Sequence, residues 1–317
     1  MDPRQVGAGT LSRAVSMFAL ATLTGCGSAG RGAFTDSPDG GTTQTSPSPN
    51  EPGGPQGPGF DTSEAGTNPN PPSCATETQF VYAITEENKL YRFDPDTLAF
   101  TSIGTFDCKN SERPHSMAVD RNGVAWIVYT DGNLYHVSTT NASCTPTGFE
   151  RRQSNVTIFG MGFSSTSAGS GDEQLFITKS DTGEKEHTFG TIDTKTLKLS
   201  LIGEFDKLSA RAEFTGTGDA RLFGAFEGSP YVVAEIDKST GKILSQAPQS
   251  EIQYPPSKSH FAFAAWGGDF WVFAGPAGST DVFQYRPSTG QTKKVATEAF
   301  EIVGAGVSTC APTAPVK

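Results

Sequence analysis

Residues 117–137 read MAVDRNGVAWIVYTDGNLYHV, and this run contains three apolar stretches separated by two short polar turns. The second and third stretches, VAWIVY and LYHV, are rich in the β-branched and aromatic residues that favour strands. A further alternating stretch, CTPTGF, follows at residues 144–149. The run therefore predicts a compact unit of four short strands.

The same unit recurs along the chain. A turn signature returns at intervals of about 44 to 55 residues, which is the sign of a repeat architecture. Its copies begin at Asp94, Ser138, Asp193, Asp237 and Arg286. Each copy has an alternating strand on either side and a third strand upstream (FVYAIT, VAWIVY, QLFITK, RLFGAF and DFWVFA). A fourth strand of small and apolar residues precedes these in four copies (SMAVD, FGMGFS, FTGTGD and FAFAAW) but is missing before Phe80.

The missing strand is found at the other end of the chain. Residues 302–308 read IVGAGVS and consist of small and apolar residues, as the four opening strands do. Five units of four strands with one displaced strand predict an all-β fold, a five-bladed β-propeller closed by its C-terminal strand. Small residues suit innermost strands, which crowd around the axis; they are Gly160, Gly162, Gly216, Gly218, Gly304 and Gly306. A many-stranded β-sandwich is the alternative, but it does not account for the matching C-terminal strand.

The N-terminus has the order of an export signal. Arg4 and Arg13 precede the apolar run Ala14–Leu23, which is too short to span a bilayer. The run ends in Leu23-Thr24-Gly25-Cys26, which resembles the lipobox of bacterial lipoproteins. We therefore expect a lipoprotein signal peptide at residues 1–25 and lipidation of Cys26. An ordinary secretory signal or a buried helix is the alternative.

The segment after Cys26 predicts a stalk. Residues 26–73 are dominated by Pro, Gly, Ser and Thr, a composition that buries too little apolar surface to fold. We expect a disordered linker here and the propeller domain at residues 74–317, with no membrane-spanning helix in that domain. Gly27 is not the aspartate that accompanies inner-membrane retention, so the lipobox resemblance implies a lipid anchor in the outer membrane, facing the periplasm or the surface.

Charge excludes one class of partner. The formal net charge is −10, and the Lys and Arg residues are scattered along the sequence. No basic stripe is present to neutralise phosphates, so nucleic acid is not expected as a partner.

The four remaining cysteines predict disulfides. Cys74 precedes the first strand and Cys310 follows the last, so a closed ring would bring them together. Cys108 and Cys144 lie in adjacent units and would form the other pair, although four cysteines allow three connectivities. No C-x-x-C motif or cluster of His residues favours zinc, and no metal or other cofactor is expected.

Candidate ligand-binding residues stand just before the innermost strands, where propellers usually bind. They are Arg113 and His115, Arg151 and Arg152, Arg211 and Glu213, Lys258 and His260, and Glu298 and Glu301. His titrates near neutral pH and Arg binds carboxylates in a bidentate manner, so a shared funnel would suit acid–base chemistry or an anionic ligand. The strongest candidates are His115, His260, Glu213, Glu301, Arg113 and Arg211. The alternative is that these are solvated loop charges; no catalytic residue is assigned.

Two further motifs are interpreted as structural. Asp120-Arg-Asn-Gly123 lacks the additional carboxylates of a calcium loop and predicts a hairpin turn. Trp126, Trp266 and Trp271 stand at strand positions and are expected to pack between blades rather than to bind sugars.

Together, MAVDRNGVAWIVYTDGNLYHV, GTIDTKTL, GGDFWVF and IVGAGVSTC resemble a family of uncharacterised propeller lipoproteins found in myxobacteria and related bacteria. The resemblance covers about residues 74–315 and implies export, lipidation and the propeller fold, without a reaction.

Three functions fit these features. The first is a membrane-anchored binding or scaffolding module, a monomer that engages an unknown protein, peptide or glycan. The second is a lactonase-like or lyase-like enzyme with a site in the central funnel, using a metal or the pair His115 and His260. The third is an outer-membrane assembly factor with an exposed apolar groove or edge. The recurring features all serve architecture, which favours the first.

Overall fold

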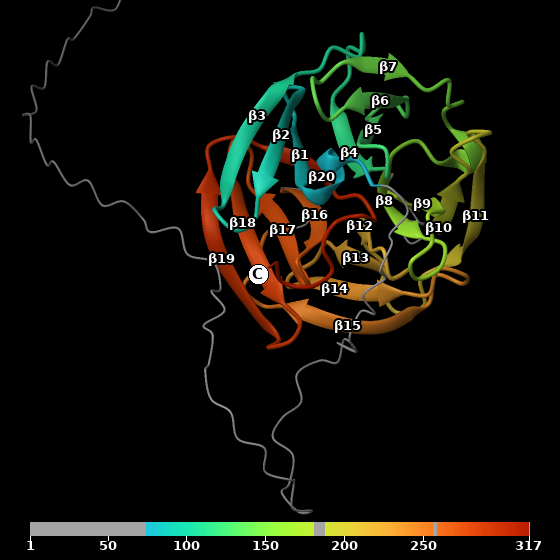
Figure 1. The fold of residues 1–317 in the computed structure, drawn as a ribbon. Helices are drawn as coiled ribbons and strands as arrows, with labels where there is room; N and C mark the ends of the chain where they lie inside the picture. The colour runs from blue at the N-terminus through green and yellow to red at the C-terminus, as the bar shows by residue number, and fades with distance from the viewer. Residues whose placement is uncertain (1–73, 181–187, 256–258, 317) are drawn as a thin grey trace, which may run out of the picture. The chain divides into compact units, whose positions relative to one another are not determined.

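The computed structural model describes residues 74–180, 188–255 and 259–316. The predicted signal peptide, Cys26 and stalk lie outside these residues. The described chain forms five antiparallel four-stranded sheets, and Figure 1 shows them arranged as blades around a common axis. The predicted five-bladed propeller is confirmed.

The blades are numbered in chain order, and their strands are given from the axis outward. Blade 1 contains β20 (Ile302–Gly306), β1 (Val81–Thr85), β2 (Lys89–Asp94) and β3 (Ala99–Thr105). Blade 2 contains β4 (Pro114–Val119), β5 (Val124–Tyr129), β6 (Leu134–Ser138) and β7 (Cys144–Pro146). Blade 3 contains β8 (Phe159–Ser165), β9 (Glu173–Lys179), β10 (Thr188–Ile192) and β11 (Leu199–Glu204). Blade 4 contains β12 (Ala212–Gly216), β13 (Leu222–Phe226), β14 (Tyr231–Ile236) and β15 (Ile243–Gln249). Blade 5 contains β16 (His260–Trp266), β17 (Asp269–Gly275), β18 (Thr280–Arg286) and β19 (Gln291–Glu298). Two short 3-10 turns, η1 (Thr76–Gln79) and η2 (Gln153–Asn155), complete the elements.

The C-terminal strand closes the ring, as the sequence predicted. β20 pairs with β1 in antiparallel register, with Ala305 opposite Ala83. The innermost strands β4, β8, β12, β16 and β20 contact one another in a closed cycle. Blade 1 is therefore assembled from both ends of the domain.

Close approach of the innermost strands explains their glycines. A Cβ atom at Gly160 of β8 would lie 1.9 Å from the carbonyl oxygen of Ala212 on β12. A Cβ atom at Gly216 would lie 2.2 Å from the carbonyl oxygen of Phe163. Neither distance is physically possible, so these positions require glycine for the inner wall to form.

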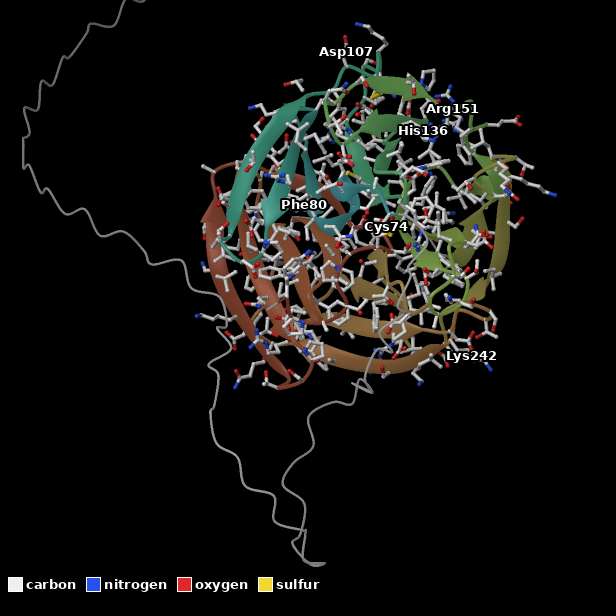
Figure 2. All side chains as sticks on the ribbon, viewed as in Figure 1. Cys74, Phe80, Asp107, His136, Arg151 and Lys242 are labelled. Carbon is white, nitrogen blue, oxygen red and sulfur yellow. A yellow bond between two sulfur atoms is a disulfide. The ribbon has the colours of Figure 1, made fainter. Side chains whose placement is uncertain are left out.

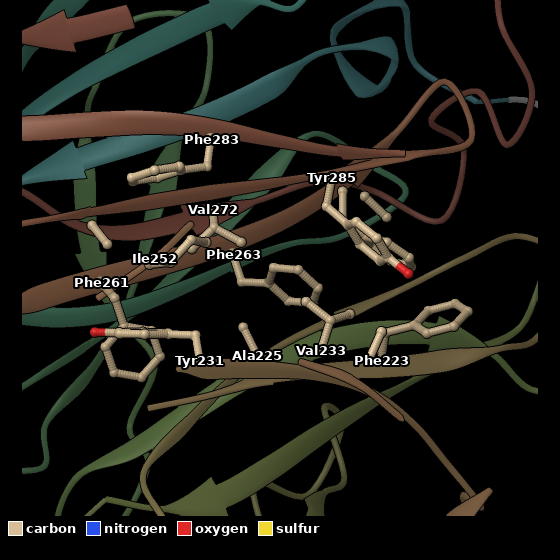
Figure 3. Packing of buried hydrophobic residues seen from close by; sticks show 14 residues of the cluster. Phe223, Ala225, Tyr231, Val233, Ile252, Phe261, Phe263, Val272, Phe283 and Tyr285 are labelled. Carbon is tan, nitrogen blue, oxygen red and sulfur yellow. The ribbon is translucent and has the colours of Figure 1, made fainter. Parts of the chain in front are cut away.

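The core is divided among the five gaps between neighbouring blades. In β16, Phe261 and Phe263 pack toward blade 4, while Ala262 and Ala264 pack toward blade 1. Figure 3 shows the gap between blades 4 and 5, where Phe263 and Tyr285 from blade 5 meet Val233 and other residues of blade 4. Because successive side chains of a strand point to opposite faces, inner strands bury both faces and are nearly continuous apolar runs.

Outer strands differ because one face meets water. β3 contains only partly buried and exposed side chains, and in β11 only Leu199 is buried while most of the others are exposed. β7 is only three residues long, shorter than the stretch expected from CTPTGF. It ends at Pro146, which has no amide hydrogen to continue the ladder.

The motifs interpreted as structural are also explained. Asp120 Oδ1 accepts hydrogen bonds from the backbone amides of Asn122 (2.9 Å) and Val124 (3.0 Å), which closes the predicted turn. Gly123 in this turn has a φ of 74°, a conformation that favours glycine. Trp126 and Trp271 are buried between blades.

Both predicted disulfides are present. Cys74 and Cys310 lie 6.1 Å apart between Cα atoms and join the two ends of the domain, and Cys108 and Cys144 lie 5.1 Å apart and join blades 1 and 2. Disulfides persist in oxidising compartments, which indicates an extracytoplasmic protein.

A polar network surrounds the first disulfide, at the end of the ring where the innermost strands finish. Arg121 donates to the Thr309 hydroxyl (3.0 Å), and that hydroxyl donates to Glu173 Oε2 (2.9 Å). The backbone amide of Arg121 donates to Glu173 Oε1 (2.8 Å). Burial raises the pKa of Glu173 to about 7. This network links blades 1, 2 and 3 across the seam.

Candidate functional site

A cavity of about 130 Å³ lies at the opposite end of the ring, where the chain enters the innermost strands. All five blades contribute to its lining. The six residues that the sequence singled out most strongly all line it: Arg113, His115, Arg211, Glu213, His260 and Glu301. They converge because they occupy equivalent heights at or just before the starts of β4, β12, β16 and β20, which meet at the axis.

Glu213 lies across the axis at the closed end of the cavity. Only 3% of the residue is exposed, and its Oε2 accepts a hydrogen bond of 2.6 Å from the hydroxyl of Ser116 on β4. The Ser116 hydroxyl in turn accepts a hydrogen bond of 3.2 Å from the backbone amide of Met161 on β8. Burial raises the pKa of Glu213 well above its usual value, and Ser116 and Arg211 oppose this only in part. Burial therefore favours the protonated form of Glu213.

His115 stands beside this group as a neutral imidazole. Burial, aided by the positive charge of Arg211, lowers its pKa to about 4. Its Nε2 atom is buried and has no hydrogen-bond partner among residues 74–180, 188–255 and 259–316. A buried polar atom without a partner costs free energy, so it is a feature that structures normally avoid unless a ligand or water satisfies it.

Arg211 is held rigidly by an acid from the same blade. Its Nε and Nη2 donate to the two carboxylate oxygens of Glu227 at 2.8 and 2.7 Å. The guanidinium also lies 5.7 Å from the ring centroid of Phe261. Bidentate pairing of this kind fixes both the position and the plane of the guanidinium. Arg211 therefore presents a fixed positive charge to the cavity.

His260 and Glu301 form a second polar group. His260 Nδ1 lies 3.2 Å from Glu301 Oε1, and its Nε2 lies 2.9 Å from the Thr280 hydroxyl. The contact with Glu301 is an approach between two titratable groups rather than a well-formed hydrogen bond, because its angles are poor. Burial lowers the pKa of His260, although Glu301 acts in the opposite direction.

Arg113 and Glu86 form an ion pair at the mouth of the cavity. The Arg113 side chain is 67% exposed and the Glu86 side chain 27% exposed. Such a pair contributes little to stability because water screens it. It leaves two charges at the opening where a partner would first make contact.

Three other candidates do not line the cavity. Arg151 approaches Asp131 at 3.7 Å, and Figure 2 shows it away from the centre of the ring. Arg152 is exposed in the loop before η2. Glu298 is the last residue of the outer strand β19 and pairs with Thr280. None of these three residues lines the cavity, so the prediction that they share the funnel was wrong for them. Lys258 lies outside the described residues.

Sequence reasoning missed a second repeated position. Glu86, Thr130 and Ser180 line the cavity, and each follows directly after the second strand of its blade. Glu227, which holds Arg211, occupies the same position in blade 4. Aligning the repeated units could have revealed these residues, because a polar residue follows the same strand in four units, namely FVYAIT, VAWIVY, QLFITK and RLFGAF.

The part of the chain that the structure describes has neither a metal-binding cluster nor a membrane-spanning helix. No three His, Cys, Asp or Glu side chains there lie in an arrangement that could hold a metal ion. None of the helices within these same segments has the length and apolar character needed to cross a membrane.

Comparison with known proteins shows no close relative. No protein-family model matches the chain, and no curated protein matches its sequence. Among solved structures, a protein of unknown function from Bacteroides thetaiotaomicron has 14% identity and a TM-score of 0.47, with 70% of this chain and 56% of that chain covered. BamB from Moraxella catarrhalis has 14% identity and a TM-score of 0.29, with 70% and 62% covered. YCF48, solved bound to D1 peptide, has 13% identity and a TM-score of 0.34, with 67% and 62% covered. This chain thus spans less than two thirds of each of these proteins, and no residue role is carried over from them.

Proposed function

We propose that this protein is a lipid-anchored, extracytoplasmic binding module that engages its partner at the end of the ring containing the central cavity. The observation that carries the proposal is the convergence of polar side chains from all five blades on one cavity. Most of these residues are not needed to hold the blades together, because the apolar gaps between blades do that. A polar cavity on a rigid scaffold is the usual form of a binding site.

The anchor is part of the proposal and rests on the sequence. The lipobox at residues 23–26 and the Pro- and Gly-rich segment that follows would attach the propeller to the outer membrane through a flexible tether. The partner class is a protein, peptide or glycan exposed on the same membrane. Replacing Cys26 by Ser should abolish incorporation of labelled palmitate and release the protein from the membrane fraction.

Binding is tested by cross-linking the full chain in its native membrane and identifying the captured partner by mass spectrometry. Arg113→Glu places two acids side by side at the cavity mouth and should reduce capture at least about threefold, because rim charges control encounter. Lys242→Glu is the matched control, since Lys242 is exposed in the turn between β14 and β15 at the other end of the ring and lies at its periphery in Figure 2. Equal capture by both variants would exclude the cavity end as the binding surface.

A further inference from the structure

His115, Arg211 and Glu213 all line the central cavity. The guanidinium of Arg211 is the charged group that acts on both His115 and Glu213. Glu213 is buried and reaches Ser116 across the axis. Burial favours its protonated form, and a protonated carboxyl group can donate a hydrogen bond. His115 offers a buried Nε2 atom that no described residue satisfies, and a neutral imidazole can carry its proton there.

A small oxyanion is the ligand that complements His115, Glu213 and Arg211. A carboxylate has only acceptor oxygens and one negative charge, so it would satisfy His115 and Glu213 and face Arg211 at the same time. Desolvating the carboxylate is tolerable because charged and neutral donors replace its water, and Arg211 is already fixed by Glu227.

Size limits the ligand further. The cavity measures about 130 Å³. An engineered protein cavity of about 150 Å³ accommodates benzene, so this one would hold a group of about six non-hydrogen atoms. A carboxylate with a short substituent fits, whereas a whole sugar residue does not.

We infer that the central cavity binds a carboxylate head group, of a short organic acid or of a peptide C-terminus, through His115 Nε2, the Glu213 carboxyl group and the Arg211 guanidinium. This inference rests on the proposed binding function and names its ligand class. In the bound state the carboxylate lies against the closed end of the cavity, and the remainder of the ligand points toward Arg113 and Glu86 at the mouth.

The test uses the full chain purified in detergent and ligand-observed NMR or calorimetry. Propionate is compared with propionamide, and N-acetyl-Gly-Ala with its C-terminal amide. The carboxylates should bind with a dissociation constant on the order of millimolar, and each amide at least about tenfold more weakly. Stronger binding of the peptide than of propionate would identify a C-terminus as the source, and the reverse would identify a free acid.

Two variants test the assigned groups. His115→Phe keeps an aromatic ring but removes the donor, so propionate affinity should fall about tenfold or more. His136→Phe is the matched control, because His136 Nε2 is also buried without a partner among the described residues but lies on β6 against Trp126, outside the cavity. Glu213→Gln keeps a neutral donor and should change the affinity by less than about threefold. An affinity gain of more than about tenfold in Glu213→Gln would show that Glu213 is ionised and would overturn the inference.

Failure of the inference is distinguishable from failure of the proposed function. Equal binding of propionate and propionamide would exclude the carboxylate site. So would the failure of both carboxylates to bind at concentrations well above the expected millimolar dissociation constant. Membrane capture that still depends on Arg113 would then leave the binding module intact, with a ligand of another class. Thermal unfolding of each variant checks that a lost signal reflects binding rather than folding.

Discussion

Breaking the disulfide that closes the ring should cost more stability than breaking the one between blades 1 and 2. Cys74 and Cys310 are 236 residues apart in sequence, and Cys108 and Cys144 are 36 residues apart. In the chain-entropy account a cross-link removes more freedom from the unfolded chain when its loop is longer. That account gives about 5.5 kcal/mol for the first bond and about 3.8 kcal/mol for the second, a difference of about 1.7 kcal/mol at 25 °C.

The folded state adds to this difference in the same direction. β20 is held to blade 1 by its ladder with β1, and Cys310 follows it by four residues. Without the bond to Cys74, the segment after β20 keeps only noncovalent contacts, among them the packing of Val307 and the hydrogen bonds of Thr309 with Arg121 and Glu173. Fraying at this seam opens the ring, whereas fraying at Cys144 affects only the three-residue outer strand β7.

The assay compares Cys74→Ser/Cys310→Ser with Cys108→Ser/Cys144→Ser, both in the full chain, by thermal unfolding monitored with circular dichroism. Both variants should fold, because the apolar gaps between blades remain. The first should melt about 3–7 °C below the second, since 1 kcal/mol corresponds to about 2–4 °C for a domain of this size. Wild-type protein in reductant should resemble a chain lacking both bonds. Equal melting temperatures, or the reverse order, would refute the loop-closure reasoning.

Three further outcomes follow from particular contacts. Gly160→Ala should destabilise the protein by about 2–3 kcal/mol in urea unfolding, because the added Cβ would overlap the Ala212 carbonyl group. Gly104→Ala on the outer strand β3 is the control and should cost less than about 1 kcal/mol, because the atom nearest to its added Cβ would be 3.2 Å away. Glu173 has a folded pKa of about 7, above its unfolded value, so its own contribution to stability should be fully present below about pH 4.5 and should be lost as the pH rises through 7, by at most about 3 kcal/mol. Glu173→Gln should flatten the stability–pH curve between these two values, and an unchanged curve would assign this part to another group. Glu227→Gln should lower the free energy of unfolding by about 3–5 kcal/mol, measured by urea unfolding, because it leaves the half-buried Arg211 without its counter-charge. A decrease of less than about 1 kcal/mol would contradict the rigid positioning of Arg211.

Repetition in the sequence is what made the fold predictable. Each unit repeats the same order of small, apolar and alternating strands, and the period of two is a local property of the backbone that needs no tertiary information. The displaced strand at Ile302–Gly306 even revealed how the ring closes. The disulfide partners followed from the closure, because the two ends of the domain must meet.

The candidate site was predictable only in part, for a geometric reason. His115, Glu213 and His260 stand at the starts of innermost strands, so their height and distance from the axis follow from the repeat. Arg151 stands in a longer connection, whose path the repeat does not determine, and Glu298 still belongs to the outer strand β19. The strand-following residues Glu86 and Ser180 were missed because they are separated in sequence from the positions they face.

The sequence by itself determined the number of blades, the strand that closes them and the residues that gather at one end of the axis, because these depend on local periodicity and on repetition. Only the tertiary structure decided the chemical state of that site. The hydrogen bond from Ser116 to Glu213 crosses the axis between residues 97 positions apart. Burial raises the pKa of Glu213 and lowers the pKa of His115, and so favours the uncharged form of each. Desolvation and long-range pairing depend on where distant segments meet, and no local pattern encodes that distance.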